Sequence, residues 1–429
     1  MAANEPAPAA GEPEKSRQRR AFDRIRSAVV WLHRWLGLLM TLFLLVEAVT
    51  GSILAFEGPI GRWLDPPERL VPASESGIPA LDLASLAAAV ERAHPELQVL
   101  YFHGTDPDVA VARCRPRFDP RNGRPLEVRV DHIVLDAHTG RELLRLPQEE
   151  SRRPFAGRVM PFIRDLHFNL ALGEGGALLL FLVALAWTVD CFGGLFLTLP
   201  RGLASFWRRW GPSWGIRLGS SAYRSNHDVH RAGGLWLWLL WFAFAWSSVQ
   251  LEQHWGLYDR IMAAIFPYAE AEDTFAAWPR HDPGVPLRMD WFDAQARGRE
   301  LMAQEAARQG FRILEPTDLV HFADNGLYNY SVRTDRPFPA HVEETVFFDG
   351  DSGARVTLPG IERLAGDVVS DWLRALHMAR DPLDYVAYRT VVCLAGLVLA
   401  ALCVTGVVVW NRKRRARIGG ARRAIRNRT

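Results

Sequence analysis

Four histidines at the ends of long apolar runs are the residues whose type and spacing could do chemistry. The pattern H-R-x-x-G begins at His33 and again at His230, and the pattern R-x-L-H ends at His167 and again at His377. Ionisable side chains at the edge of a membrane segment are candidates for function by default. Two neutral imidazoles on facing helices can hold the iron of a planar macrocycle as its axial ligands.

The apolar runs that position these histidines predict a membrane protein. Hydrophobic residues make up 49% of the 429 residues, and four runs reach the length of about 20 residues that a hydrocarbon core requires. The first run could also be a cleaved signal peptide, but it is long for one and no clear A-x-A site follows it. The predicted spans are 29–56, 167–199, 230–251 and 388–410.

Basic residues predict the orientation of these spans. Arginines are concentrated in segments 1–28, 200–229 and 411–429, which the positive-inside rule places in the cytoplasm. Both termini are then cytoplasmic, and the long segments 57–166 and 252–387 face the periplasm of a bacterial inner membrane. The middle basic segment interleaves tryptophan with arginine, which predicts an interfacial loop against lipid. These arginines therefore indicate membrane contact and not nucleic-acid binding.

The order of span, outer segment and span occurs twice along the chain. The outer segments share a D-x-x-[ST]-G turn, at Asp136–Gly140 and Asp349–Gly353. Each is predicted to be a helix followed by strands, because β-branched and aromatic runs come after a helical pattern. The expected fold is an α-helical membrane protein with a four-helix transmembrane bundle, two periplasmic α+β domains and an internal two-fold repeat. The predicted helices are 81–93 and 291–309, and the predicted strands are 99–102, 109–113, 126–135, 313–322, 328–334 and 343–348.

The repeat predicts that the four histidines form two pairs, one at each face of the membrane. His33 and His230 fall together at the cytoplasmic ends of the first and third spans, and His167 and His377 at the outer ends of the second and fourth. This arrangement predicts two haem b groups, one in each leaflet, with these histidines as axial ligands. Covalent c-type attachment through CxxCH is excluded, because that motif does not occur. Seven other histidines of the outer segments are interpreted as ordinary surface or half-buried residues, namely His94, His103, His132, His138, His281, His321 and His341.

Small and basic residues near the histidines fit the same ligand. Gly37 and Gly234 lie one helical turn after His33 and His230, where a missing side chain lets a porphyrin approach. Arginines within three residues of the histidines could pair with haem propionates, although arginines beside spans are common in any case. These arginines are Arg34, Arg231, Arg164 and Arg374.

Several polar residues keep alternative interpretations. His227 and His230 form an HxxH pattern, but the further donors that zinc needs are missing nearby. His227 is therefore predicted to support the site or to replace His230 as a ligand, and His254 is a spare candidate for the outer haem. Glu47 and Asp190 lie inside spans, where they could handle protons, line a quinol site or be hydrogen-bonded buried acids.

These motifs resemble the PepSY-associated transmembrane proteins, and within that family the inner-membrane ferric-siderophore reductases. The resemblance runs from His33 to Trp410. It implies PepSY-like periplasmic domains, b-type haem, and electrons passing from a quinol or a cytoplasmic reductase through the inner and outer haems to a ferric siderophore or other ferric chelate. The expected enzyme is a transmembrane haem-dependent ferric reductase that releases Fe(II).

A haem-free function remains as the alternative. The spans could simply anchor the outer domains, which would then bind a peptidase or an uptake receptor as a membrane-anchored regulator. The sequence shows no nucleotide-binding glycine motif that would indicate another cofactor. The colour of the purified protein distinguishes the two functions, because only a haem protein absorbs strongly in the visible range.

Overall fold

The computed structural model divides the chain into two compact units. One is helical and consists of Met1–Ser52, His167–Glu252 and Val391–Thr429; the other, the α+β unit, consists of Ile53–Leu166 and Gln253–Thr390. The residues that the structure describes are 14–64, 79–103, 108–119, 121–128, 130–147, 155–202, 205–217, 219–252, 254–268, 279–282, 285–336, 343–357, 364–379 and 386–426.

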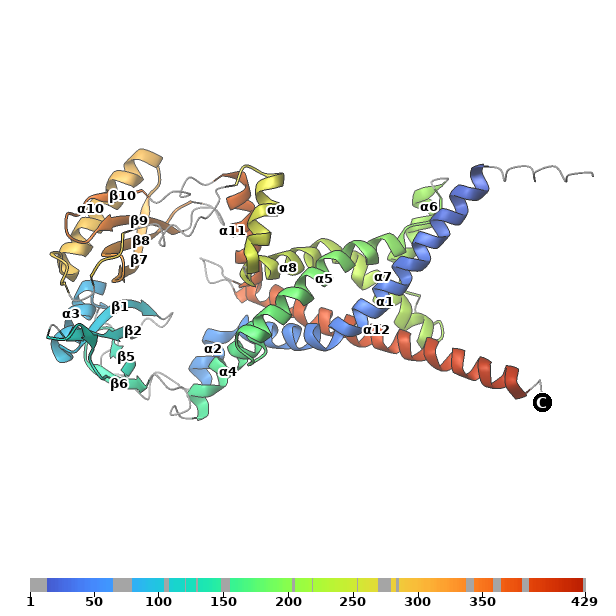
Figure 1. Cartoon of the computed structure of the whole chain (residues 1–429), viewed down its shortest axis with the longest axis horizontal. Helices are drawn as coiled ribbons and strands as arrows, with labels where there is room; N and C mark the ends of the chain where they lie inside the picture. Colours follow the sequence, from blue (N-terminus) through green and yellow to red (C-terminus); the bar gives the residue numbers. More distant parts are fainter. Residues whose placement is uncertain are drawn as a thin grey trace, which may run out of the picture. The chain divides into compact units, whose positions relative to one another are not determined.

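Within the described ranges, three helices are long and apolar enough to cross a membrane. They are α1 (Glu14–Leu54), α5 (Glu174–Thr198) and α12 (Val386–Arg426). A fourth span is formed if α7 (Ala222–Trp236) and α8 (Trp238–Glu252), which meet at a bend of 67°, cross as one. Figure 1 shows these helices, with α1 in blue and α12 in red. The chain is a multi-pass membrane protein.

The second and third predicted spans differ from the observed helices. The segment 167–199 is not one helix, because α4 (Phe155–Asn169) ends before α5 begins, and Leu170 and Ala171 between them have left-handed backbone with φ of 57° and 55°. The segment 230–251 is broken at Leu237. Hydropathy counts apolar residues over a window and is insensitive to such local changes of backbone direction.

Apolar side chains join the helices of the helical unit. Met40 and Leu44 of α1 pack with Val183 of α5, while Cys191 of α5 belongs to a cluster with Trp241 of α8 and residues of α12. Two short elements, α6 (Phe206–Trp210) and the 3-10 helix η4 (Gly211–Trp214), lie between α5 and α7. The helical unit therefore has a packed interior to which α1, α5, α8 and α12 all contribute.

The α+β unit contains the same motif twice, a helix followed by a four-stranded antiparallel sheet. The first sheet has the order β1-β2-β5-β6 and the second β10-β9-β8-β7. The predicted helix 291–309 and strand 313–322 coincide with α10 and β7. The elements are α3 (Leu83–Ala93), β1 (Leu97–His103), β2 (Val109–Pro116), the hairpin β3 (Phe118–Asp119) and β4 (Arg124–Pro125), β5 (Val130–Asp136), β6 (Glu142–Pro147), α10 (Trp291–Gln309), β7 (Ile313–Phe322), β8 (Leu327–Thr334), β9 (Glu343–Asp349) and β10 (Arg355–Val356).

Equivalent caps and turns relate the two motifs. The carboxylates of Asp82 and Asp290 each accept a backbone N–H at the start of α3 and α10. In the D-x-x-[ST]-G turns, the backbone carbonyls of Asp136 and Asp349 accept the N–H of Gly140 and Gly353. Both glycines have positive φ, of 70° and 67°, a conformation that a residue without Cβ adopts at least cost.

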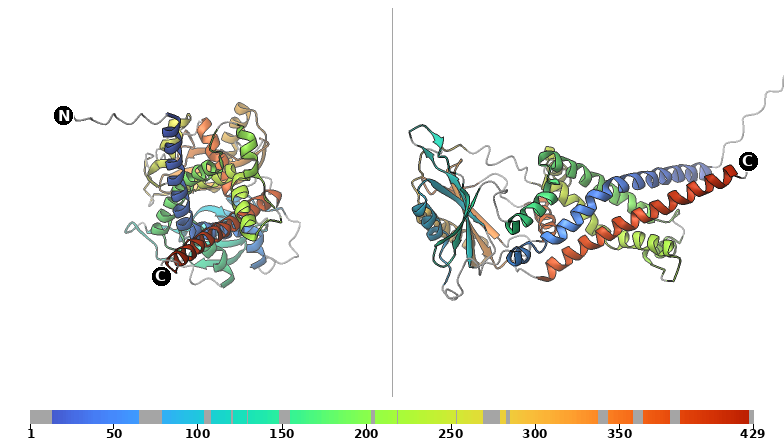
Figure 2. Two further views of the ribbon diagram at one scale, coloured as in Figure 1. Left: turned by 90° about the vertical axis from the view of Figure 1, so that its right-hand side faces the viewer. Right: turned by 90° about the horizontal axis from the view of Figure 1, so that it is seen from below.

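The two motifs share one hydrophobic core. Strands β1 and β7 lie next to each other, as do α3 and α10, and the two sheets are the teal and orange strands in Figure 2. Ile133 and Leu135 of the first motif belong to the same buried cluster as Leu319 and Phe348 of the second. The two motifs thus belong to one compact unit. Short helices flank it at equivalent points of the two halves, namely α2 (Glu57–Leu64), the 3-10 helix η5 (His254–Gly256), α9 (Leu257–Ile265) and α11 (Ala365–His377).

Candidate functional site

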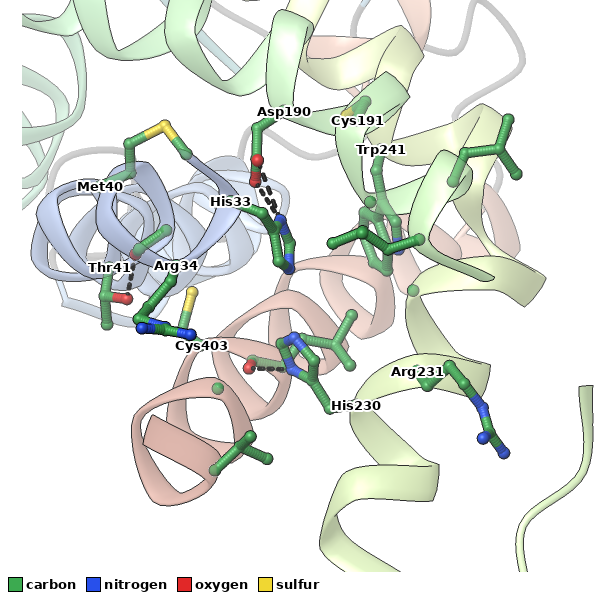
Figure 3. A pocket seen from close by; sticks show the side chains of 18 of the residues that line it. His33, Arg34, Met40, Thr41, Asp190, Cys191, His230, Arg231, Trp241 and Cys403 are labelled. Atoms are coloured by element: carbon green, nitrogen blue, oxygen red, sulfur yellow. Dashed lines mark hydrogen bonds and ion pairs between the residues drawn. The ribbon is translucent and has the colours of Figure 1, made fainter. Parts of the chain in front are cut away.

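Two of the predicted histidines face each other inside the helical unit. His33 on α1 and His230 on α7 have ring centres 6.3 Å apart, with ring planes inclined by 51°, and Figure 3 shows the rings turned toward one another. Two imidazoles that bind one metal ion from opposite sides, through metal–nitrogen bonds of about 2 Å, have ring centres about 6 Å apart. The spacing of this pair therefore fits a shared metal centre.

The outer nitrogen of each ring is held by the protein. His33 Nδ1 donates to the Asp190 carboxylate, with oxygens at 2.9 and 3.0 Å. His230 Nδ1 donates to the carbonyl oxygen of Leu402 and to Thr405 Oγ1, both at 3.1 Å. An imidazole whose Nδ1 carries the proton presents the lone pair of Nε2, and such an outer hydrogen bond is the usual companion of a metal-ligating histidine.

Glycines lie against both rings and beside the space between them. A Cβ at Gly194 would come within 3.7 Å of His33 Cε1, and a Cβ at Gly406 within 3.1 Å of His230 Cε1. A Cβ at Gly37 or Gly234 would meet no atom within 4 Å. The first two glycines therefore let the imidazoles pack closely on α5 and α12, whereas Gly37 and Gly234 face open space, where the approach of a porphyrin stays a prediction.

The histidine pair opens onto a cavity of about 430 Å³. Apolar side chains from α1, α5, α8 and α12 form much of its wall, including Leu44, Trp187 and Leu399, and basic side chains line it as well. The basic lining residues are Arg26, Arg34, His227, Arg231 and Lys413. A flat apolar molecule that carries acidic groups matches this lining, because the wall can bury its body while the cations pair with its carboxylates.

Two basic residues predicted for carboxylate recognition differ in their contacts. Arg34 lines the cavity, and the described residues supply no acceptor for its guanidinium. Arg231 instead donates to the carbonyl oxygens of Pro212, Ser213 and Gly215 and pairs with the buried carboxylate of Asp228. Arg231 therefore fixes the loop between α5 and α7 next to His230, and Figure 3 shows its side chain pointing away from that ring.

The HxxH pattern of His227 and His230 gains no further zinc donors from the described residues. Across the residues that the structure describes, no group of three or more His, Cys, Asp or Glu side chains is placed to hold a metal ion. His227 lines the cavity beside His230, and its nearest acid is Asp228, with Nδ1 to Oδ1 at 3.9 Å. A metal ion held by His33 and His230 would need its other donors from a bound ligand, as a porphyrin supplies.

The helical unit thus combines an apolar histidine-lined cavity with the membrane-crossing helices of the repeat. The sequence model of one protein family, the PepSY-associated TM region, matches residues 30–413 of this chain. The chain belongs to this family. No curated protein matches it.

A third histidine of this PepSY-associated protein, His167, has the same kind of surroundings. His167, at the end of α4, donates Nδ1–H toward Glu47 Oε2 and Thr50 Oγ1, both at 2.9 Å. A Cβ at Gly51 would come within 3.0 Å of His167 Cε1. A polar acceptor at Nδ1 and a glycine against Cε1 are the two features that also mark His33 and His230.

The predicted outer partner lies in the other unit. His377 is the last residue of α11 and belongs to the α+β unit, so the pairing of His167 with His377 stays a prediction. Arg164 pairs with Glu57 within the α+β unit, and Arg374 is an exposed residue of α11. The spare candidate His254 lies in η5 of the same unit.

The sequence located the histidines of this PepSY-associated protein but missed what holds them. For Asp190 the sequence predicts a proton-handling residue, a quinol-site residue or a hydrogen-bonded buried acid without naming its partner, and no pattern marks Thr405. A usable signal exists, because Gly194 follows Asp190 and Gly406 follows Leu402 at the same spacing in the two halves. Aligning the second and fourth spans from these glycines identifies the acceptors of both histidines.

Proposed function

We propose that this chain is an inner-membrane di-haem b electron-transfer protein that reduces a ferric siderophore or another ferric chelate in the periplasm and releases Fe(II). The observation that carries the proposal is the His33–His230 pair. Each ring is fixed through Nδ1, and the two rings face each other at 6.3 Å beside an apolar cavity. This is the donor set of a bis-histidine haem.

Residues of the helical unit have distinct tasks at the inner site. His33 and His230 would hold the haem iron. Gly37 and Gly234 would leave space for the macrocycle. Arg34, which lines the cavity, would pair with a haem propionate. Haem b bound there supplies reversible one-electron chemistry. Apolar side chains form much of the wall, and such surroundings lower the local dielectric constant, which would make each charge near the bound haem more effective.

The surroundings of His167 support a second site. Its Nδ1 contacts and its glycine neighbour repeat the pattern of the inner pair, and the repeat of the sequence assigns His377 as the equivalent residue of the second half. Arg164 is paired with Glu57, and the contact of Arg164 and Arg374 with the propionates of this second group stays a prediction.

The charge distribution supports the direction of the reaction. The arginine-rich segments favour a cytoplasmic position for both termini, where a cytoplasmic reductase could deliver electrons. A quinol in the lipid is the other donor class. The α+β unit then faces the periplasmic chelate. One electron converts one Fe(III) to Fe(II), and hard oxygen donors hold the less charged ion less strongly. A quinol, with two electrons, would reduce two ferric ions and release two protons.

Purification in detergent from haem-sufficient cells tests the proposal. We expect a Soret band, sharp α-bands after reduction, and about two haems per chain. Addition of a ferric chelate to the anaerobically reduced protein should reoxidise it and yield Fe(II), which a ferrous-specific dye detects. A colourless protein with intact folding would reject the proposal and favour the membrane-anchored regulator that binds a peptidase or an uptake receptor.

A further inference from the structure

The two imidazoles of the inner site have different proton acceptors. His33 Nδ1 faces both oxygens of the Asp190 carboxylate, at 2.9 and 3.0 Å. His230 Nδ1 faces two neutral oxygens, the Leu402 carbonyl and the Thr405 hydroxyl. Leu402 stands where the repeat has Asp190, as the spacing to Gly406 and Gly194 shows. The second half of the chain therefore lacks the charge that the first half supplies.

The position of Asp190 makes this charge effective. Its side chain is 11% exposed and lines the cavity together with His33. Figure 3 shows it reaching from α5 to the far side of the His33 ring. A hydrogen bond to an ionised acceptor is roughly twice as strong as one between neutral groups, and the surrounding apolar side chains of α1, α5 and α8 screen the charge poorly.

We propose that Asp190 is a positioning residue that orients His33 and increases the electron density on its Nε2, so that the two axial ligands of the inner site are unequal and its reduction potential is lowered. This inference rests on the proposed function. The physical basis is that a carboxylate draws the Nδ1 proton toward itself, which makes the ring a stronger donor. A stronger donor favours the more highly charged, oxidised iron, and hydrogen bonding around a ligand is one of the means by which proteins set a potential.

A lower potential suits the proposed substrate. Iron(III) in a tight oxygen-donor chelate resists reduction, so the protein needs a strong reductant close to its electron entrance. Asp190 provides this property without touching iron, because it acts through His33. Thr405 provides the matched comparison, because its replacement leaves the Leu402 carbonyl as an acceptor for His230.

Potentiometric titration of the full-length protein tests the inference with Asp190→Asn, Asp190→Glu and Thr405→Val. We expect Asp190→Asn to keep its haem and to make reduction of the inner site at least tenfold more favourable, which raises a one-electron potential by about 59 mV. Asp190→Glu should restore most of the original potential, and Thr405→Val should change the equilibrium less than threefold. Loss of the inner haem from Asp190→Asn but not from Asp190→Glu would also support a need for the charge.

Two outcomes would overturn the inference. One is an equal potential in Asp190→Asn and the unaltered protein; the other is the same loss of haem from Asp190→Asn and Asp190→Glu, which would mean that Asp190 only fills space. Both outcomes differ from failure of the proposed function, because the unaltered protein would then contain no haem.

Discussion

The first and second halves of the chain use the same scaffold but different polar contacts. Both place a histidine near the start of a span, a glycine against its ring, and an aspartate at the cap of an extramembrane helix. They differ in what holds the imidazole, because the first half offers the Asp190 carboxylate and the second half a carbonyl and a hydroxyl. Positions that set backbone geometry recur, whereas positions that set the local charge do not.

The same contrast appears in the α+β unit. His94 of the first motif is buried between Glu96 and Glu142, with its Nε2 2.6 Å from Glu142 Oε2. His321 of the second motif stacks on Tyr328, at 4.7 Å between ring centres, and its Nε2 has no hydrogen-bond partner among the residues that the structure describes. Two buried histidines on one scaffold therefore have opposite electrostatic surroundings.

The largest expected effect tests whether the halves contribute equally to the inner site. His33→Ala and His230→Ala should each lower the haem content from about two to about one per chain, because a bis-histidine site loses low-spin ligation when either ligand is removed. Haem quantification and the reduced spectrum check this, with His138→Ala as the control that keeps both groups. If His230→Ala retains both haems while His227→Ala loses one, the ligand is His227.

The pH dependence of unfolding tests the electrostatic surroundings of His321. Burial, with Arg115 and Arg117 nearby, lowers the pKa of His321 to about 3 from 6.5. The unfolded chain therefore gains a proton first, so stability is full above pH 6.5 and is lost as the pH falls toward 3. Between pH 7 and 5 this loss amounts to about 2 kcal/mol.

The variant His321→Phe should remove that loss. Its free energy of unfolding, measured by urea titration in detergent at the two pH values, should fall by about 2 kcal/mol less than that of the unaltered protein. Tyr328→Phe, which keeps His321 and a stacking ring, is the control and should retain the pH dependence. An identical pH dependence in His321→Phe would show that His321 does not take up the proton on unfolding.

Replacing Gly406 and Gly194 by alanine should show that the His230 ring is packed more tightly against its glycine than the His33 ring is. At Gly406 the new Cβ is 3.1 Å from His230 Cε1 and must displace the ring, whereas at Gly194 it is 3.7 Å from His33 Cε1 and makes ordinary contact. We expect Gly406→Ala to weaken haem binding about tenfold, or about 1.4 kcal/mol, and Gly194→Ala less than threefold. Transfer of haem to a scavenger protein measures both, and equal effects would contradict the difference in packing.

The smallest expected effect concerns the shared scaffold. Asp82→Ala and Asp290→Ala each remove a side-chain cap and should each lower the free energy of unfolding of the α+β unit by about 1 kcal/mol. Thermal unfolding followed by circular dichroism checks this, with Asp82→Asn and Asp290→Asn as variants that keep a capping oxygen. A much larger cost at one site would show that the two caps are not equivalent.

Much of the architecture was determined by local sequence. The helix 291–309 and the strand 313–322 were predicted with their observed bounds, because side-chain periodicity and flanking turn residues report on a single element. The histidine positions were likewise predictable, since H-R-x-x-G and R-x-L-H recur at the ends of apolar runs. The bend at Leu237 and the break at Leu170 were not, because they change backbone direction without changing the apolar composition.

The sequence by itself determined that the chain is a membrane protein with several apolar spans, and its repeated motifs predicted which histidines correspond in the two halves. Only the tertiary structure decided that Asp190 holds His33 across a separation of 157 residues, that Gly406 lies against His230, and that the guanidinium of the cavity-lining Arg231 is bound by loop carbonyls. The physical reason is the distance along the chain over which each property acts. Hydropathy and repeated motifs are properties of neighbouring residues, whereas a hydrogen bond or a close packing contact exists only once distant helices have taken their places against one another.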